Sequence, residues 1–172
     1  VTCSLMGLGS FPGNDPLWRG MLGMHGTYHA NMAVSHCDLL LAIGVRFDDR
    51  VTGTIDTFAA NAKIVHIDID PSSINKNVTV DLPIIGDTKA TLRDLLRFLE
   101  EHHYEQETSS RQAWFSEITE WREKVPLTYC QNGEIIKPQY VIETLYKLTG
   151  GDALITTEVG QNQMWTAQFF KF

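Results

Sequence analysis

The chain has 172 residues, of which 43% are hydrophobic and 20% are charged. This composition is typical of a globular protein and excludes a disordered or collagen-like chain. Fourteen Lys and Arg against 21 Asp and Glu give a net charge of -7, so neither a nucleic-acid backbone nor an anionic membrane surface is a favoured partner.

Cysteine usage and the two ends of the chain bear on its compartment and its completeness. Cys3, Cys37 and Cys130 are widely spaced and form no CxxC pair, which argues against a disulfide framework or a structural zinc site and favours a reducing cytoplasm. The longest apolar run, residues 39–45, is too short to span a bilayer. The chain lacks an initial Met and a basic leader, and it ends in the aromatic-rich residues 165–172, which would need a partner surface. We therefore expect a piece of a larger protein.

Three apolar runs predict three strands. Residues 38–45 form a continuous run that ends at Gly44, and residues 63–70 form a second run that Pro71 closes. Such runs are typical of strands buried on both faces of a parallel sheet covered by helices. Residues 82–87 are a third, shorter candidate.

Helical patterns accompany the predicted strands. Residues 26–36 are compatible with a helix, and residues 88–101 are the clearest case because leucines recur there at helical spacing. Asp87 and Thr88, just after Gly86, are residue types that favour a helix N-cap. The alternation of strand and helix predicts an α/β fold with an open parallel sheet.

The rest of the chain is expected to form a connection and the start of a second domain. Residues 102–133 begin with a polar stretch and contain one helical pattern, which Pro126 ends. A further helix opens at Pro138 and stops at Gly150, and residues 152–157 predict the next strand. The expected domains are residues 1–101, 102–133 and 134–172.

In an open α/β sheet, ligands bind beyond the carboxyl ends of the strands. Arg46, Asp48, Asp49 and Arg50 directly follow the first predicted strand. They form either a solvated loop with internal ion pairs or a site where an arginine binds phosphate or carboxylate oxygens. Position alone favours neither interpretation.

Two aspartates end the second predicted strand. An acidic residue at this place often binds ribose hydroxyls in nucleotide-binding sheets, and we favour this interpretation for Asp68. For Asp70, which precedes Pro71, a helix N-cap or an Asx turn is the better interpretation.

Two glycine-rich segments, residues 6–10 and 22–26, would let the backbone approach a ligand closely. Neither matches the GxGxxG pattern between a strand and a helix, so turn glycines are the simpler interpretation. His25 and His29 are four residues apart, but no HExxH pattern or nearby carboxylate completes a metal site, and we predict no metal ligands in this chain. These residues alone predict a nucleotide-binding α/β domain joined to a partial second domain.

Five sequence motifs stand out: residues 4–9 (SLMGLG), 21–26 (MLGMHG), 44–53 (GVRFDDRVTG), 66–70 (HIDID) and 158–165 (EVGQNQMW). Together they resemble the large catalytic subunit of the acetolactate synthase (acetohydroxyacid synthase) family, which depends on thiamine diphosphate. The resemblance covers almost the whole chain in the family's order, and the motif at 44–53 is highly specific.

The resemblance implies a three-domain enzyme. This chain would be most of the central, Rossmann-like FAD-binding domain, the connecting helix and the first βα unit of the thiamine-diphosphate-binding domain. The family decarboxylates pyruvate and condenses the hydroxyethyl unit with a second 2-oxo acid in valine, leucine and isoleucine biosynthesis. The implied cofactors are FAD, thiamine diphosphate and magnesium. The implied partners are 2-oxo acids, further catalytic subunits in a homo-oligomer and a small regulatory subunit.

Site residues follow from the resemblance position by position. It implies FAD contacts at Ser4, Leu5, Leu22, Gly23, Met24, His25, Gly44, Val45, Arg46, Phe47, Asp48, Asp68, Ile69, Asp87 and Thr88. Gln161 and Asn162 match positions near the thiamine diphosphate, although the family usually has His where this chain has Asn162. Asp49 and Arg50 match the active-site entrance, which herbicides contact.

No catalytic residue is expected within the chain. The glutamate that activates the thiamine ring and the magnesium-binding Gly-Asp-Gly motif are not found in these 172 residues, so we expect the chain alone to be inactive. Two alternatives are another thiamine-dependent carboligase or decarboxylase, and a stand-alone nucleotide-binding or regulatory module. The motifs at 21–26 and 44–53 argue against the first alternative, and the motif at 158–165 argues against the second.

Overall fold

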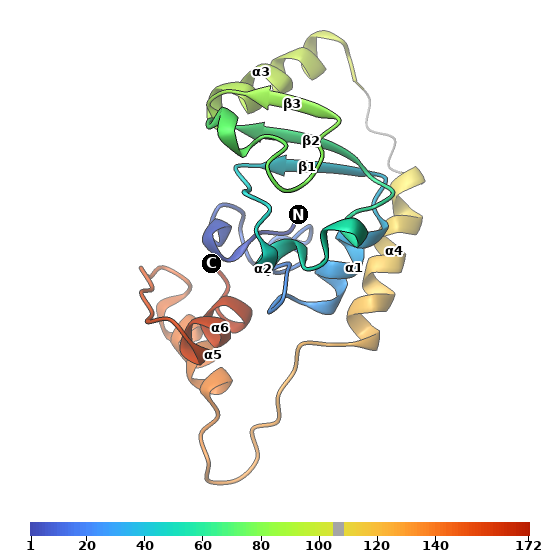
Figure 1. Cartoon of the computed structure of the whole chain (residues 1–172). Helices are drawn as coiled ribbons and strands as arrows, with labels where there is room; N and C mark the ends of the chain where they lie inside the picture. Colours follow the sequence, from blue (N-terminus) through green and yellow to red (C-terminus); the bar gives the residue numbers. More distant parts are fainter. Residues whose placement is uncertain (105–108) are drawn as a thin grey trace. The chain divides into compact units, whose positions relative to one another are not determined.

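The computed structural model describes residues 1–104 and 109–172. Its elements in chain order are η1 (Leu5–Gly7), α1 (Tyr28–His36), β1 (Leu39–Ile43), α2 (Asp49–Thr52), η2 (Ile55–Thr57), β2 (Lys63–Asp68), η3 (Pro71–Ser73), β3 (Leu82–Ile85), α3 (Thr88–Glu101), α4 (Ser109–Lys124), α5 (Pro138–Thr149) and α6 (Gln161–Phe169), where η marks a short 3-10 helix (Figure 1). Among these described helices, none combines the length and apolar character that crossing a membrane requires.

The described residues divide into two compact units. One consists of Val1–Asn31 together with Trp121–Phe172, and the other of Met32–Glu120. These units follow the packing of the chain and do not coincide with the expected domains, whose boundaries at 101 and 133 stay a prediction.

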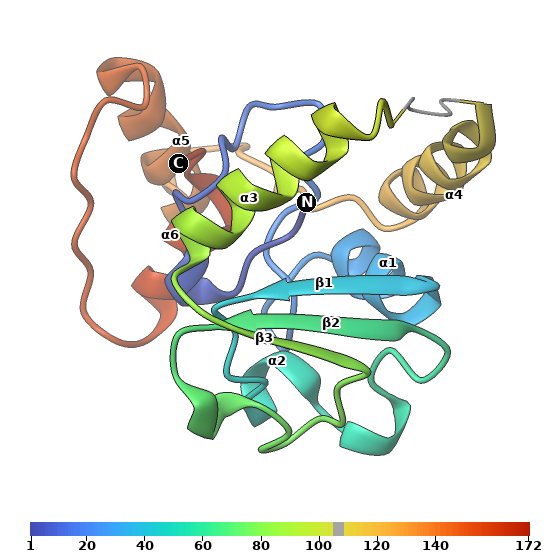
Figure 2. The same ribbon diagram turned by 90° about the horizontal axis from the view of Figure 1, so that it is seen from above.

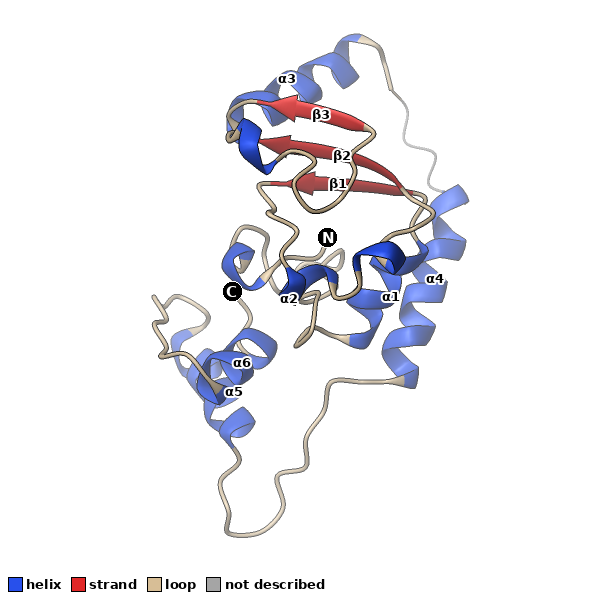
Figure 3. Ribbon diagram, viewed as in Figure 1, coloured by secondary structure: helices blue, strands red, loops and turns tan. Residues whose placement is uncertain are grey.

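The unit Met32–Glu120 is built on a parallel sheet with the strand order β1-β2-β3 (Figure 3). Leu41 pairs with Val65, which in turn pairs with Leu82, and the three arrows point the same way, so their carboxyl ends meet at one edge. α3 lies on one side of this sheet, where it contacts β2, and α2 lies on the other (Figure 2). A buried hydrophobic cluster in this unit consists of Ala42, Phe47, Ile64, Val78 and Val80. The predicted open α/β sheet is confirmed.

The strands and the clearest helix form where the sequence patterns place them. Each strand begins within one residue of its expected start and ends two residues before its expected end. β1 stops early because Gly44 leaves the extended conformation with a φ of 60°. α3 spans the predicted residues 88–101, because the Asp87 carboxylate accepts the N–H of Ala90 at 2.9 Å and caps the first turn.

The other unit corrects two expectations. Residues 152–157 form no strand: a strand needs a partner for its backbone groups, and here the side chain of Leu154 is wholly exposed. The aromatic residues near the end of the chain find their partner surface within this unit. Phe170 is 4% exposed, and its ring lies edge-on to that of Tyr146 with the centroids 5.5 Å apart. The expected βα unit therefore has its helix, α6, but not its strand.

Burial makes the stability of this unit depend on pH through His29 of α1. The side chain is 8% exposed, and desolvation, followed by the charges of Arg122 and Arg19, lowers its pKa from the ordinary value of 6.5. The unfolded chain therefore binds this proton more readily than the folded chain. The free energy of unfolding should fall as the pH drops through 6.5 and should level off below the pKa of the folded state.

Urea unfolding of the chain and its His29→Gln variant, from about pH 8 to about pH 5, measures this dependence. We expect a shallower slope for the variant, whose amide does not titrate. Equal slopes would assign the pH dependence to other groups.

Candidate functional site

The loop after β1 is anchored by a buried, strained residue. Phe47 has a φ of 52°, a left-handed conformation that is rare for bulky residues, and it is 3% exposed. Its ring lies edge-on to Phe58 and His66, with centroid distances of 5.8 and 5.0 Å. The ring thus fixes the loop to the core, while Arg46 and Asp48 on either side lie nearer the surface.

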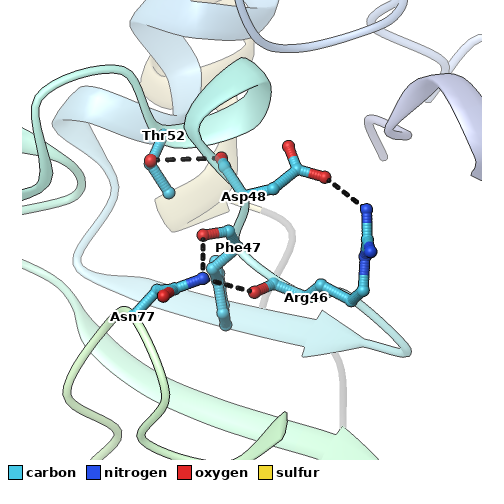
Figure 4. Close-up of polar contacts among 5 residues, drawn as sticks. All are labelled: Arg46, Phe47, Asp48, Thr52 and Asn77. Atoms are coloured by element: carbon cyan, nitrogen blue, oxygen red, sulfur yellow. Dashed lines mark hydrogen bonds and ion pairs between the residues drawn. The ribbon is translucent and has the colours of Figure 1, made fainter.

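Arg46 and Asp48 pair with each other. Nη2 of Arg46 lies 3.0 Å from Oδ2 of Asp48, and the two side chains are 77% and 37% exposed (Figure 4). This confirms the internal ion pair, one of the two sequence interpretations. Because such exposed pairs contribute at most about 1 kcal/mol, Arg46 can transfer to a ligand anion at little cost. The second oxygen of Asp48, Oδ1, is buried and has no hydrogen-bond partner in the part of the chain that the structure describes.

The carboxylates at the end of β2 have different surroundings. Asp68 is 7% exposed; its Oδ1 accepts the N–H of Asp70 at 2.8 Å, and its Oδ2 lies 3.6 Å from Nε2 of the fully buried His66. Asp70 is exposed and accepts both the N–H and the hydroxyl of Ser72 at 2.9 Å. These two bonds, the backbone one first, lower the pKa of Asp70. The turn-capping interpretation of Asp70 is confirmed, and a ribose contact of Asp68 through Oδ2 stays a prediction.

The three strand ends lie side by side. The N–H of Gly44 donates to the carbonyl of Ile67 at 2.8 Å, and the N–H of Gly86 donates to that of Asp68 at 3.0 Å. Among the described residues, a Cβ on Gly44 would meet nothing within 4 Å, so a ligand could approach its backbone. We call residues 44–48, 68–69 and 86–88 the strand-end edge. It gathers the predicted FAD residues of this unit: Gly44, Val45, Arg46, Phe47, Asp48, Asp68, Ile69, Asp87 and Thr88.

The predicted FAD residues of the other unit also lie close together. Cys3 and Met21 form an isolated parallel bridge, and the N–H of Leu22 donates to the carbonyl of Cys3 at 3.1 Å. Asn31 of α1 holds Gly23 at both backbone groups: it accepts the N–H at 2.7 Å and donates to the carbonyl at 3.0 Å. The residues gathered here are Ser4, Leu5, Leu22, Gly23, Met24 and His25.

A cavity of about 650 Å³ lies between α5, α6 and residues 155–158. Its wall is largely apolar, but Glu158 and Asn162 also line it, and Nδ2 of Asn162 donates to Oε1 of Glu158 at 3.2 Å. Gln161, the other residue predicted near the thiamine diphosphate, is exposed and does not line this cavity. Asp49 and Arg50, the predicted entrance residues, are exposed on α2. Within residues 1–104 and 109–172, no three His, Cys, Asp or Glu side chains come together to hold a metal ion.

Sequence reasoning missed two asparagines that hold the predicted binding loops. One is Asn31, described above, and the other is Asn77, whose Nδ2 donates to the carbonyls of Arg46 and Phe47 at 3.2 and 3.0 Å. Asn77 lies about thirty residues after the loop that it binds. No local pattern marks such a contact, because it depends on how the loop before β3 returns to the end of β1.

Residues 1–95 match the sequence profile described as the thiamine pyrophosphate enzyme, central domain. The chain belongs to the thiamine pyrophosphate enzyme family. The matched residues include the whole sheet and both groups of predicted FAD residues.

Three curated relatives extend the likeness of this thiamine pyrophosphate enzyme chain beyond residue 95. Over 172 residues it is 48% identical to the acetolactate synthase isozyme 3 large subunit of Escherichia coli strain K12. It is 53% identical to the chloroplastic acetolactate synthase 3 of Brassica napus and 52% identical to the chloroplastic acetolactate synthase 1 of Oryza sativa subsp. japonica. The alignment covers 100% of this chain but only 30%, 26% and 27% of these relatives, respectively.

Proposed function

We propose that the protein containing this chain is the catalytic subunit of an acetolactate synthase. It would decarboxylate pyruvate and condense the hydroxyethyl unit with a second 2-oxo acid in branched-chain amino-acid biosynthesis. The observation that carries this proposal is the 48% to 53% identity, over all 172 residues, to proteins named acetolactate synthase. A stand-alone nucleotide-binding or regulatory module would not require this identity through residues 158–165, where the thiamine diphosphate is expected.

The strand-end edge has the groups that an FAD molecule would need. The open space beside Gly44 admits a phosphate-bearing ligand to the backbone. Arg46, held by an exposed ion pair, supplies a planar cation for phosphate oxygens. The buried Oδ1 of Asp48 supplies an acceptor for a ligand N–H or O–H. In this proposal FAD is bound as a largely structural cofactor.

The chain contributes binding and positioning groups rather than catalytic ones. Thiamine diphosphate, when bound with magnesium, supplies the electron sink for decarboxylation. Gln161 and Asn162 are proposed to lie near it, and the amide of Asn162, fixed by Glu158, would donate a hydrogen bond where relatives of this kind usually have His. Asp49 and Arg50 are proposed to border the entrance for 2-oxo acids. The proposal includes a cytoplasmic homo-oligomer with a small regulatory subunit.

The test is to express the complete open reading frame that contains this chain and to assay it with pyruvate, thiamine diphosphate, magnesium and FAD. We expect acetolactate to form only when thiamine diphosphate is present, and the 172-residue chain alone to give no turnover. Release of acetaldehyde without acetolactate would indicate a decarboxylase instead. Failure to bind thiamine diphosphate or to turn over any 2-oxo acid would favour the stand-alone module.

A further inference from the structure

We infer that Asn77 is a positioning residue that orients Arg46 for FAD. Asn77 itself makes no contact with the cofactor in this inference; it acts through the backbone of residues 46 and 47. The inference rests on the proposed function, in which the loop after β1 binds FAD.

The geometry that carries the inference is a single amide group that holds two successive carbonyls. Nδ2 of Asn77 lies 3.2 Å from the carbonyl oxygen of Arg46 and 3.0 Å from that of Phe47 (Figure 4). Two neighbouring carbonyls that face the same point repel each other unless a donor lies between them. The amide nitrogen of Asn77 carries two N–H groups and can donate one to each carbonyl.

The backbone between these carbonyls has a strained conformation. Phe47 has a φ of 52°, and a non-glycine residue keeps such a conformation only where its surroundings hold it. The ring of Phe47 is held by Phe58 and His66, but a ring contact leaves the peptide groups on either side able to rotate. Asn77 is the group that holds those peptide groups, and the direction of the Arg46 side chain follows from them.

The location of Asn77 separates positioning from general stability. Asn77 is exposed and belongs to none of the helices or strands, so its removal creates no cavity in the core. A neighbouring asparagine provides a matched control. Asn75 accepts the N–H of Val80 at 2.7 Å and has a φ of 56°, so it shapes the same loop before β3. The partner of its side chain lies within that loop and not in residues 44–48.

The first experiment titrates FAD into the apo-form of the complete polypeptide and follows flavin fluorescence. We expect Asn77→Ala to raise the Kd for FAD about tenfold. Asn77→Asp should raise the Kd further, because a carboxylate would repel the two carbonyls. Asn75→Gly, which tolerates the left-handed φ but loses the bond to Val80, should change the Kd by less than about twofold.

The second experiment is a double-mutant cycle with Arg46→Ala. If Asn77 acts through Arg46, Asn77→Ala should raise the Kd by less than about threefold in the Arg46→Ala background. The thermal unfolding of the apo-protein should show nearly the same Asn77→Ala effect in both backgrounds, because the exposed pair of Arg46 with Asp48 contributes little to loop stability.

The inference is overturned if Asn77→Ala weakens FAD binding equally in both backgrounds, or no more than Asn75→Gly does. In either case the wild-type protein would still bind FAD, and the proposed function would stand. A wild-type protein that binds no FAD would overturn the FAD site and this inference together.

Discussion

Replacing Gly26 with alanine should lower the free energy of unfolding of the chain by about 3 kcal/mol, the upper end of the usual range for overpacking. A Cβ at this position would lie against the carbonyl oxygen of Met21 and only 2.6 Å from the carbonyl carbon of Leu22. Both are backbone atoms, so no side chain can turn away to make room.

The neighbouring backbone is also held in place. The carbonyl of Met21 accepts the N–H of Thr27 at 2.8 Å, and the N–H of Leu22 donates to the carbonyl of Cys3 at 3.1 Å. Relief of the contact would therefore break at least one of these bonds, each of which contributes about 1 kcal/mol. Because the same turn holds the predicted FAD residues 22–25, the substitution should also disturb that loop.

Urea unfolding of the 172-residue chain measures the loss. Gly7→Ala is the matched control, because a Cβ there would make ordinary van der Waals contacts, 3.5 Å from the Cβ of Cys3 and from the Oγ of Ser4. We expect the control to unfold at nearly the same urea concentration as the wild type. A Gly26→Ala protein as stable as the control would show that this turn can adjust its path.

The second large effect concerns FAD. In the complete polypeptide, Arg46→Ala should weaken FAD binding about ten- to hundredfold, or about 1.5–3 kcal/mol for a lost charge-assisted contact. Arg46 comes directly after the strand end at Gly44, where the backbone is open to a ligand. Arg50 lies further along, on α2, so Arg50→Ala should act mainly on turnover or inhibitor binding.

A control separates a local contact from a general loss of positive charge. Lys63 is 78% exposed and pairs with Asp81 at 3.0 Å, much as Arg46 pairs with Asp48, but it lies at the amino end of β2. Lys63→Ala should therefore leave the affinity for FAD almost unchanged. Titration of FAD into the three apo-variants decides the matter. Equal losses for Arg46→Ala and Arg50→Ala, or a larger one for Arg50→Ala, would place the flavin beside the wrong arginine.

The parts of the fold that could be predicted depend on local patterns. α3 has leucines at helical spacing and a cap at Asp87, both encoded within a few residues. β1 and β2 were recognisable because both are continuous apolar runs. The expectation that both faces of β1 are buried is wrong for the described residues, since Leu39 and Leu41 are exposed where no helix covers them. Residues 152–157 have a similar pattern, yet they form no strand, because a strand also needs a neighbour to receive its hydrogen bonds.

The candidate site also has features that local patterns predict and features that they do not. The parallel order of the strands was enough to predict that residues after Ile43 and Asp68 meet at one edge, because ligands bind beyond the carboxyl ends in such sheets. The ring packing of Phe47 against His66 and the bonds of Asn77 could not be predicted. These contacts join residues that are distant in the chain, and no sequence spacing encodes them.

By itself, the sequence determined the open α/β sheet, the segments that follow its strands and, through motifs such as GVRFDDRVTG, the family to which the chain belongs. Only the tertiary structure decided how the charged side chains of that motif are arranged. Arg46 pairs with Asp48, whose other oxygen is left buried without a partner among the described residues, and Asn77 holds the backbone between them. The physical reason is the distance along the sequence over which the interactions act. Helix and strand patterns arise from neighbours along the chain, whereas the direction of a charged side chain depends on backbone groups that only folding brings together.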